Sequence, residues 1–185
     1  MAQFVFLYPV PQIIDFEINR HASWSGKVFK KKYKKILNQC IDQRYRQKGF
    51  DINYVIFNDC VISNIIRVYS NDKIIKAGID FRQHILMNLY PDQDYILNQL
   101  NEESIIRIAG YHMWDCVDKL AKRAYQRKMD VLVDEDLTEF LSTRLDDKDF
   151  RTDQYPTYRP GKQNELLLSS FMEARKQRPW LWQNY

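Results

Sequence analysis

Short apolar runs alternate along this chain with longer segments in which apolar residues recur at helical spacing. An apolar run bounded by polar or turn-forming residues is typical of a buried strand. Runs of this kind predict strands at residues 4–8, 52–57, 73–79, 105–109 and 131–133. Pro9 and Pro11 should end the first strand, because proline cannot donate a hydrogen bond to a neighbouring strand.

The segments between these runs predict helices. Ser25 can cap a helix over residues 27–48, and Gly49 can end it. For residues 61–69 the apolar spacing fits a short helix, with a hairpin into the next strand as the alternative. Further helices are expected at residues 81–89, 92–100, 118–128 and 136–145, and a last one begins at Asn164.

Strands and helices in this order predict a three-layer α/β sandwich with a mainly parallel, Rossmann-like sheet. We expect residues 105–109 and 131–133 to be parallel strands in the sheet interior, with Ala121 and Ala124 packing the intervening helix on one face. Residues 1–150 would form this α/β domain. Residues 151–185 would form a turn-rich connector and a helix that packs on the domain or on a partner subunit of a homo-oligomer.

Composition and charge narrow the function classes. The chain has 185 residues, of which 45% are hydrophobic, so it can bury a sizeable core. Its net charge of +4 does not approach the basic excess of a dedicated nucleic-acid binder. Three cysteines without CxxC spacing indicate reduced thiols in a cytoplasmic protein and no disulfide framework or zinc site. We expect no signal peptide, no membrane span and no cofactor.

Lysines cluster in the first half of the helix predicted at residues 27–48, at Lys30, Lys31, Lys32, Lys34 and Lys35. One interpretation is a patch that binds phosphate or nucleic acid. The other is a solvated outer face, which the pattern favours because charge runs on amphipathic helices usually face water.

Cys116 is the candidate for reactive chemistry. It follows the strand predicted at residues 105–109 and should lie at the start of the next helix, at the carboxyl edge of the sheet. That edge is where ligands bind in open α/β sheets. A helix N-terminus also lowers the pKa of a thiol, which suits a nucleophile. The alternative is a buried cysteine that only packs in the core.

The segment around Cys116 resembles the nucleophile region of the isochorismatase-like cysteine hydrolases, which include nicotinamidases and related amidases. In that family a strand ends in glycine and the catalytic cysteine and a valine follow, as Gly110, Cys116 and Val117 do here. The match spans about 35 of the 185 residues and also includes, at the same spacing, Ala121, Ala124, Val131, Val133, Glu135 and Asp136. The resemblance implies a hydrolase that acts on a small amide or a related C–N bond.

The resemblance also implies a catalytic acid and a catalytic lysine. The family's first strand ends in aspartate, whereas the strand at residues 4–8 ends near Tyr8. Asp15, in the run Ile13-Ile14-Asp15-Phe16, is the alternative candidate; otherwise it is a loop carboxylate. Lys76 matches the family's lysine and would hold the thiolate and polarise the substrate carbonyl. Otherwise it is an edge-strand lysine that faces water.

The carboxyl edge of a parallel sheet should gather further polar residues around a cleft. Asp59, Asp80, His112 and Asp115 follow predicted strands, as do Asp134 and Asp136. They could assist Cys116 in attack on a small-molecule substrate, with backbone N–H groups holding the oxyanion. They could instead bind a divalent metal through His112 and carboxylates, although no spaced ligand motif supports one. The third alternative is a non-catalytic binding or assembly module.

Overall fold

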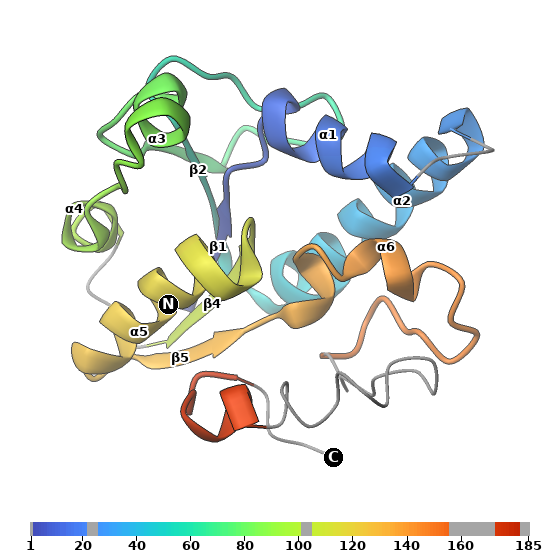
Figure 1. Cartoon of the computed structure of the whole chain (residues 1–185). Helices are drawn as coiled ribbons and strands as arrows, with labels where there is room; N and C mark the ends of the chain where they lie inside the picture. Colours follow the sequence, from blue (N-terminus) through green and yellow to red (C-terminus); the bar gives the residue numbers. More distant parts are fainter. Residues whose placement is uncertain (1, 22–25, 101–104, 156–172, 182–185) are drawn as a thin grey trace.

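The computed structural model describes residues 2–21, 26–100, 105–155 and 173–181. Its centre is a five-stranded sheet in which every pair of neighbouring strands is parallel, in the order β3-β2-β1-β4-β5. Helices cover both faces of this sheet (Figure 1). The α/β prediction is therefore confirmed. The strands are β1 (Gln3–Leu7), β2 (Asp51–Ile56), β3 (Lys73–Lys76), β4 (Ile105–Gly110) and β5 (Asp130–Val133).

The central strand explains why the apolar runs were informative. All five residues of β1 are buried, because β2 and β4 pair with its two edges and helices cover its two faces. Its run of Phe4, Val5 and Phe6 offers β-branched and aromatic side chains to both layers, which is the composition of a strand buried on both sides. The strands predicted at residues 105–109 and 131–133 are β4 and β5, and they are parallel neighbours as expected. The expected interior position is correct for β4 and wrong for β5, which is the last strand of the sheet.

The first crossover runs through α1 (Pro11–His21) and α2 (Gly26–Cys40). The helix continues as a π-helical turn, η1 (Ile41–Tyr45), and a 3-10 turn, η2 (Arg46–Lys48). Gly49 then adopts φ +79° and ends it, as predicted for a helix over residues 27–48. The inner side of α2 buries Tyr33, Leu37 and Cys40.

Residues 61–69 form neither the predicted helix nor the predicted hairpin. Contacts with distant elements replace a local hydrogen-bond ladder. The Ser63 N–H donates to the carbonyl of Pro9, and the Asn38 amide donates to the carbonyl of Ile65 and accepts from the Arg67 N–H. Ile65 and Ile66 are buried in the segment that these contacts hold in place, which is why their spacing resembled a helix face.

From Phe81 onward the helices are shorter than predicted. The predicted helices at residues 81–89, 92–100 and 118–128 correspond to α3 (Phe81–Met87), α4 (Gln93–Leu97) and α5 (Asp118–Gln126), and a π-helical turn, η3 (Met113–Val117), leads into α5. The predicted helix at residues 136–145 is instead a 3-10 turn, η4 (Glu135–Leu137), and a single helical turn, α6 (Leu141–Arg144). The break coincides with one local and one partly long-range contact. The Thr138 hydroxyl donates to the carbonyl of Glu135, and the Asp136 side chain is held in ion pairs with Arg144 and the distant Arg44.

The order of the strands reverses between β1 and β4, which are parallel neighbours in the middle of the sheet. Chain connections move outward from β1 to β2 and β3 on one side and from β4 to β5 on the other. In open α/β sheets the crevice at such a switch point, outside the carboxyl ends of the strands, is the usual ligand site. Gly110 ends β4 there with φ +111°, and Leu7 of β1 is its partner in the register.

The end of the described chain covers the outer edge of β5. Leu181 pairs in parallel with Val133, and the Val133 N–H donates to the carbonyl of Trp180 over 2.9 Å. The indole N–H of Trp180 donates to Asp118 of α5 over 2.7 Å, and both Trp180 and Leu181 are buried. This end of the chain therefore docks on the α/β domain. Trp182 lies outside the described residues, as do residues 164–172 of the helix predicted from Asn164. The oligomer contact proposed for that helix therefore also falls outside them.

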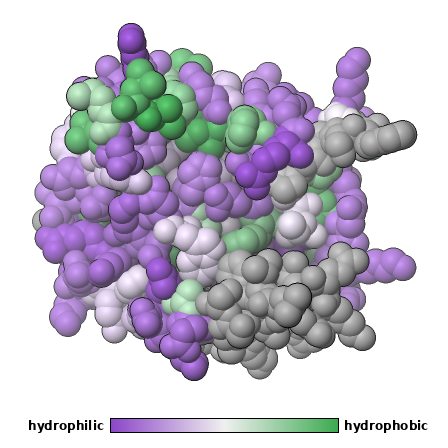
Figure 2. Space-filling view, viewed as in Figure 1, coloured by the Kyte–Doolittle hydropathy of each residue, from purple (hydrophilic) through white to green (hydrophobic). Residues whose placement is uncertain are grey.

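One face of the molecule carries an apolar patch over α3, which is the broadest strongly hydrophobic area in Figure 2. Ile85, Leu86 and Met87 are exposed there, as is Leu89 just beyond the helix. In the described part of the chain, no helix is long and apolar enough to cross a membrane.

Candidate functional site

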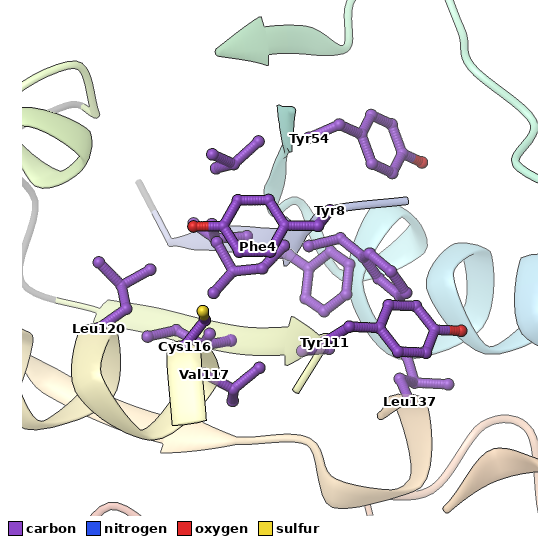
Figure 3. Close-up of a cluster of buried hydrophobic side chains, with 14 of the residues drawn as sticks. Phe4, Tyr8, Tyr54, Tyr111, Cys116, Val117, Leu120 and Leu137 are labelled. Atoms are coloured by element: carbon purple, nitrogen blue, oxygen red, sulfur yellow. The ribbon is translucent and has the colours of Figure 1, made fainter. Parts of the chain in front are cut away.

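Tyr8 and Cys116 meet at the switch point. Tyr8 follows the last residue of β1 and has φ +57°, a backbone conformation that is uncommon for a side chain of this size. Figure 3 shows the Cys116 sulfur pointing from η3 toward the sheet and the Tyr8 ring. Burial, and then the nearby Cys116 and Asp115, raise the pKa of Tyr8 well above its usual value. Tyr8 therefore remains a neutral phenol beside the thiol.

The thiol of Cys116 is buried and protonated. The residue is only 5% exposed, and burial followed by the neighbouring Asp115 carboxylate raises the pKa of the thiol to about 12. The sequence led us to expect the opposite shift from a helix N-terminus. Cys116 is instead the fourth residue of η3, and its Sγ lies 3.8 Å from Asp115 Oδ2, to which it donates. Desolvation and the negative charge of Asp115 therefore raise the pKa of the thiol by more than the start of a helix could lower it.

Asp15 and Lys76 are held by other groups. Asp15 lies within α1, not at the end of a strand, and forms an ion pair with Lys30 over 3.1 Å. Lys76 ends β3, and its ammonium donates to the carbonyls of Asn58 and Cys60, each over 3.1 Å. Across the described ranges, no hydrogen bond or ion pair joins Asp15 or Lys76 to Cys116.

Asp59 and Asp80 both serve the start of α3. The Phe81 N–H donates to Asp59 over 2.7 Å, and this hydrogen bond lowers the pKa of the Asp59 carboxyl. Asp80 forms a reciprocal capping box with Gln83, whose side-chain oxygen accepts from the Asp80 N–H over 2.9 Å. Carboxylates used in this way satisfy helix N–H groups that would otherwise lack partners. Their position after strands thus has a structural explanation.

His112 pairs with Glu139, a residue that the sequence did not single out. The imidazole Nδ1 is hydrogen-bonded to one Glu139 oxygen, and the Met113 N–H donates to the other over 2.8 Å. The hydrogen bond with Glu139 raises the pKa of His112 despite opposing burial. Glu139 therefore fills the N-terminus of η3, where a ligand anion could otherwise bind. No local pattern reveals this contact, because 27 residues separate the partners.

An aromatic wall borders Cys116 on the α3 side. Tyr8 stacks on Phe57 with ring centroids 4.4 Å apart, and Phe57 stacks on His84 at 5.3 Å. Tyr90 meets His84 edge to face, and the Lys119 ammonium lies 3.4 Å from the centre of the Tyr90 ring. Lys119 also forms an ion pair with Asp115. The charge of the predicted cleft residue Asp115 is thus balanced by Lys119 beside this wall.

The acids at the end of β5 belong to a buried ionic cluster. The Arg44 guanidinium donates to Asp134 over 2.9 Å and to Asp136 over 3.0 Å, and the Tyr45 hydroxyl donates to Asp134 over 2.5 Å. Glu135 pairs with Arg175 from the C-terminal segment. Burial raises the pKa of Glu135 to about 7 and that of Asp136 to about 6. The cluster joins η1, the residues that follow β5 and the chain end, and it is structural.

A hollow of about 330 Å³ opens at the carboxyl ends of β2 and β3. It is lined by Asn58, Ala77, Gly78, Ile79, Asp92 and Tyr95. The Gly78 N–H donates to the Asn58 side chain, and Gly78 has φ +86°, so its backbone forms part of the wall. Asn58, Asp92 and Tyr95 were not predicted as site residues.

Metal ligation finds no support in the geometry of the described ranges, where no three His, Cys, Asp or Glu side chains converge as ligands would. Compared with protein-family models, with curated proteins and with solved structures, the chain has no match.

Proposed function

We propose that this chain is a non-catalytic α/β binding module, related in its Cys116 segment to the isochorismatase-like cysteine hydrolases that it resembles. The observation that carries the proposal is the state of the Cys116 thiol. A thiol with a pKa of about 12 is ionised to only about one part in 10⁵ at pH 7, and the thiolate is the nucleophile.

Two further observations support a loss of hydrolase chemistry. Tyr8 occupies the end of the first strand, where the resembling family has its acid, and a neutral phenol beside the thiol cannot serve as a base at neutral pH. The Lys76 ammonium donates to two backbone carbonyls and would have to leave both to act on a substrate. The three free thiols accord with a reducing compartment, and we include a cytoplasmic location in the proposal.

The hollow beside β3 is the ligand site in this proposal. Its volume of about 330 Å³ is at the lower end of the range of small-molecule sites. Tyr95 is 47% exposed and offers an aromatic ring for stacking. Asp92 also lines the hollow, and its Oδ1 caps α4 by accepting from the Asp94 and Tyr95 N–H groups. These groups favour a small molecule with a flat ring and a cationic or hydrogen-bond-donating group.

Thiol labelling and a hydrolysis panel test the catalytic part of the proposal. We expect iodoacetamide at neutral pH to label Cys116 no faster than Cys60, whose thiol pKa burial raises to about 11. We also expect no turnover of nicotinamide, small amides or esters. Rapid labelling of Cys116, with a turnover that Cys116→Ser abolishes and Cys60→Ser preserves, would reverse the proposal in favour of a cysteine hydrolase.

A ligand screen by thermal shift tests the binding part. Aromatic amines that raise the melting temperature should lose their effect in Tyr95→Ala. Tyr125→Ala is the matched control, because Tyr125 on α5 is also 47% exposed but lies outside the hollow. Equal loss in the two variants, or no stabilising compound in the whole class, would remove the hollow as the ligand site.

A further inference from the structure

Helix α2 has an unusual distribution of charge. It contains six lysines and no acidic residue, and all six lie in the first ten of its fifteen residues. Lysines near the N-terminus of a helix oppose its dipole, and like charges four residues apart repel each other. Lys27 and Lys31 are such a pair, and so are Lys31 and Lys35. The arrangement therefore costs helix stability, and nothing within the helix compensates for it.

The structure divides the six lysines into two groups. Lys30 and Lys32 lie on opposite flanks, and each is paired with an aspartate: Lys30 with Asp15 over 3.1 Å, and Lys32 with Asp146 over 3.0 Å. Lys27, Lys31, Lys34 and Lys35 recur at intervals of four, seven and eight residues, which places them on one stripe along the helix.

The charge of these four stripe lysines is not balanced by any acidic side chain among the described residues. Lys34 donates to the neutral carbonyl of Asn64, and the described residues supply no ion pair to any of the stripe lysines. All four side chains are exposed. The opposite side of α2 packs in the core, so the stripe is the outward face of the helix.

We propose that the stripe Lys27, Lys31, Lys34 and Lys35 binds the phosphodiester backbone of a single-stranded nucleic acid. Eight residues separate its ends, which at 1.5 Å per residue is about 12 Å. That length spans about three to four phosphates of a strand that keeps its bases stacked, with the rise of roughly 3.4 Å per nucleotide that each strand has in B-form DNA. Lysine is a compact point charge that suits phosphate contacts without base recognition, so the binding is independent of sequence.

The acidic residues beside the stripe favour binding of a narrow polyanion over binding of a flat membrane. Asp146 is 89% exposed beside the stripe, and Asp147 and Asp149 follow it in the chain. A flat anionic bilayer would meet these carboxylates together with the lysines. A single strand laid along the helix avoids them. The apolar side of α2 is buried in the core and cannot insert into lipid.

Fluorescence anisotropy with a labelled oligothymidylate of about twelve nucleotides tests the proposal. For three to four neutralised phosphates, the logarithm of the binding constant should fall with the logarithm of salt concentration with a slope of about −2 to −3. The double variant Lys31→Gln, Lys35→Gln should bind at least about tenfold more weakly at low salt and reduce the slope by about one or more.

Lys122→Gln with Lys128→Gln is the matched control, because it removes the same charge from exposed lysines at the α5 end of the protein. It should bind as the unchanged chain does. The stripe variant should melt at the same temperature as the unchanged chain or higher, because lysine repulsion is relieved. The proposal is overturned by absence of binding at about 50 mM salt, by equal weakening in both double variants, or by stripe-dependent binding to phosphatidylserine vesicles that exceeds binding to the oligonucleotide.

Discussion

Replacing Gly110 by alanine should be among the most damaging small changes in this chain. Gly110 ends β4 at the switch point with φ +111°, a conformation that residues with a side chain rarely adopt. A Cβ added there would lie 2.2 Å from the Leu7 carbonyl oxygen, 2.5 Å from the Leu7 nitrogen and 2.9 Å from the Leu7 carbonyl carbon. All three atoms are backbone of the central strand, so no side chain can rotate away.

The expected cost has two parts. The backbone conformation alone costs on the order of 1–3 kcal/mol for alanine. Relieving the overlap requires β1 and β4 to separate, and overpacking of a well-packed core typically costs a further 1–3 kcal/mol, occasionally more. Together they give about 2–6 kcal/mol, a large share of the roughly 5–15 kcal/mol by which domains are stable.

Gly49→Ala is the control that isolates the overlap. Gly49 also has a positive φ, of +79°, but a Cβ added there meets no atom within 4 Å. Gly49→Ala should lose only about 1–2 kcal/mol, which is the cost of the left-handed conformation alone. Urea unfolding followed by circular dichroism measures both variants. If Gly110→Ala lost no more stability than Gly49→Ala, the close approach of β1 and β4 would not limit this position, and the reasoning would be refuted.

Three other perturbations concern the ionic cluster and the chain end. Arg44→Leu should lower the free energy of unfolding by about 3–5 kcal/mol in urea, because it leaves the buried Asp134 and Asp136 without their main counter-charge. Glu135 binds its proton more tightly folded than unfolded, since burial raises its pKa to about 7. The free energy of unfolding should therefore fall as pH rises from about 5 to 8, and fall less in Glu135→Gln. Trp180→Phe should lower the melting temperature, because Asp118 loses its indole donor.

Each of these expectations has an opposing result. A loss below about 1 kcal/mol in Arg44→Leu would place the cluster in a solvated environment. Parallel pH profiles for Glu135→Gln and the unchanged chain would assign the pH dependence to other groups. An unchanged melting temperature in Trp180→Phe, with Trp114→Phe as a comparison, would mean that the chain end contributes little to the stability of the sheet.

The strands were predictable because their information is local. The run at Phe4 to Tyr8 is apolar and is followed by two prolines, and a strand buried on both faces must be made of such apolar residues. The end of the first long helix was equally local, since Gly49 supplies the left-handed residue that ends it. The pattern at residues 61–69 was misleading because Ile65 and Ile66 are buried in a segment that is held by distant residues: Asn38 donates to the Ile65 carbonyl, and the Ser63 N–H donates to the Pro9 carbonyl.

The candidate site likewise combines features that local sequence determines with features that depend on distant contacts. The position of Cys116 at the carboxyl edge is a consequence of strand, glycine and helix order, and it could be predicted. The protonation state of its thiol depends on burial beneath Tyr8 and on the orientation of Asp115, which no spacing rule encodes. Arg44 and Asp134 lie 90 residues apart, so the sequence could not reveal that a strand-end aspartate is part of the core.

The two edges of the sheet imply different risks of self-association. An unpaired strand edge can template pairing with another chain. In the described part of the molecule, Leu181 occupies the edge of β5, whereas β3 ends the sheet on the other side and carries Lys73 and Lys76 at its two ends. Like-charged lysines would repel each other if two β3 edges approached. Proteolytic loss of the chain after residue 155 would leave β5 without such a guard, so the first fibrils or soluble aggregates of a nicked protein should grow from the β5 edge.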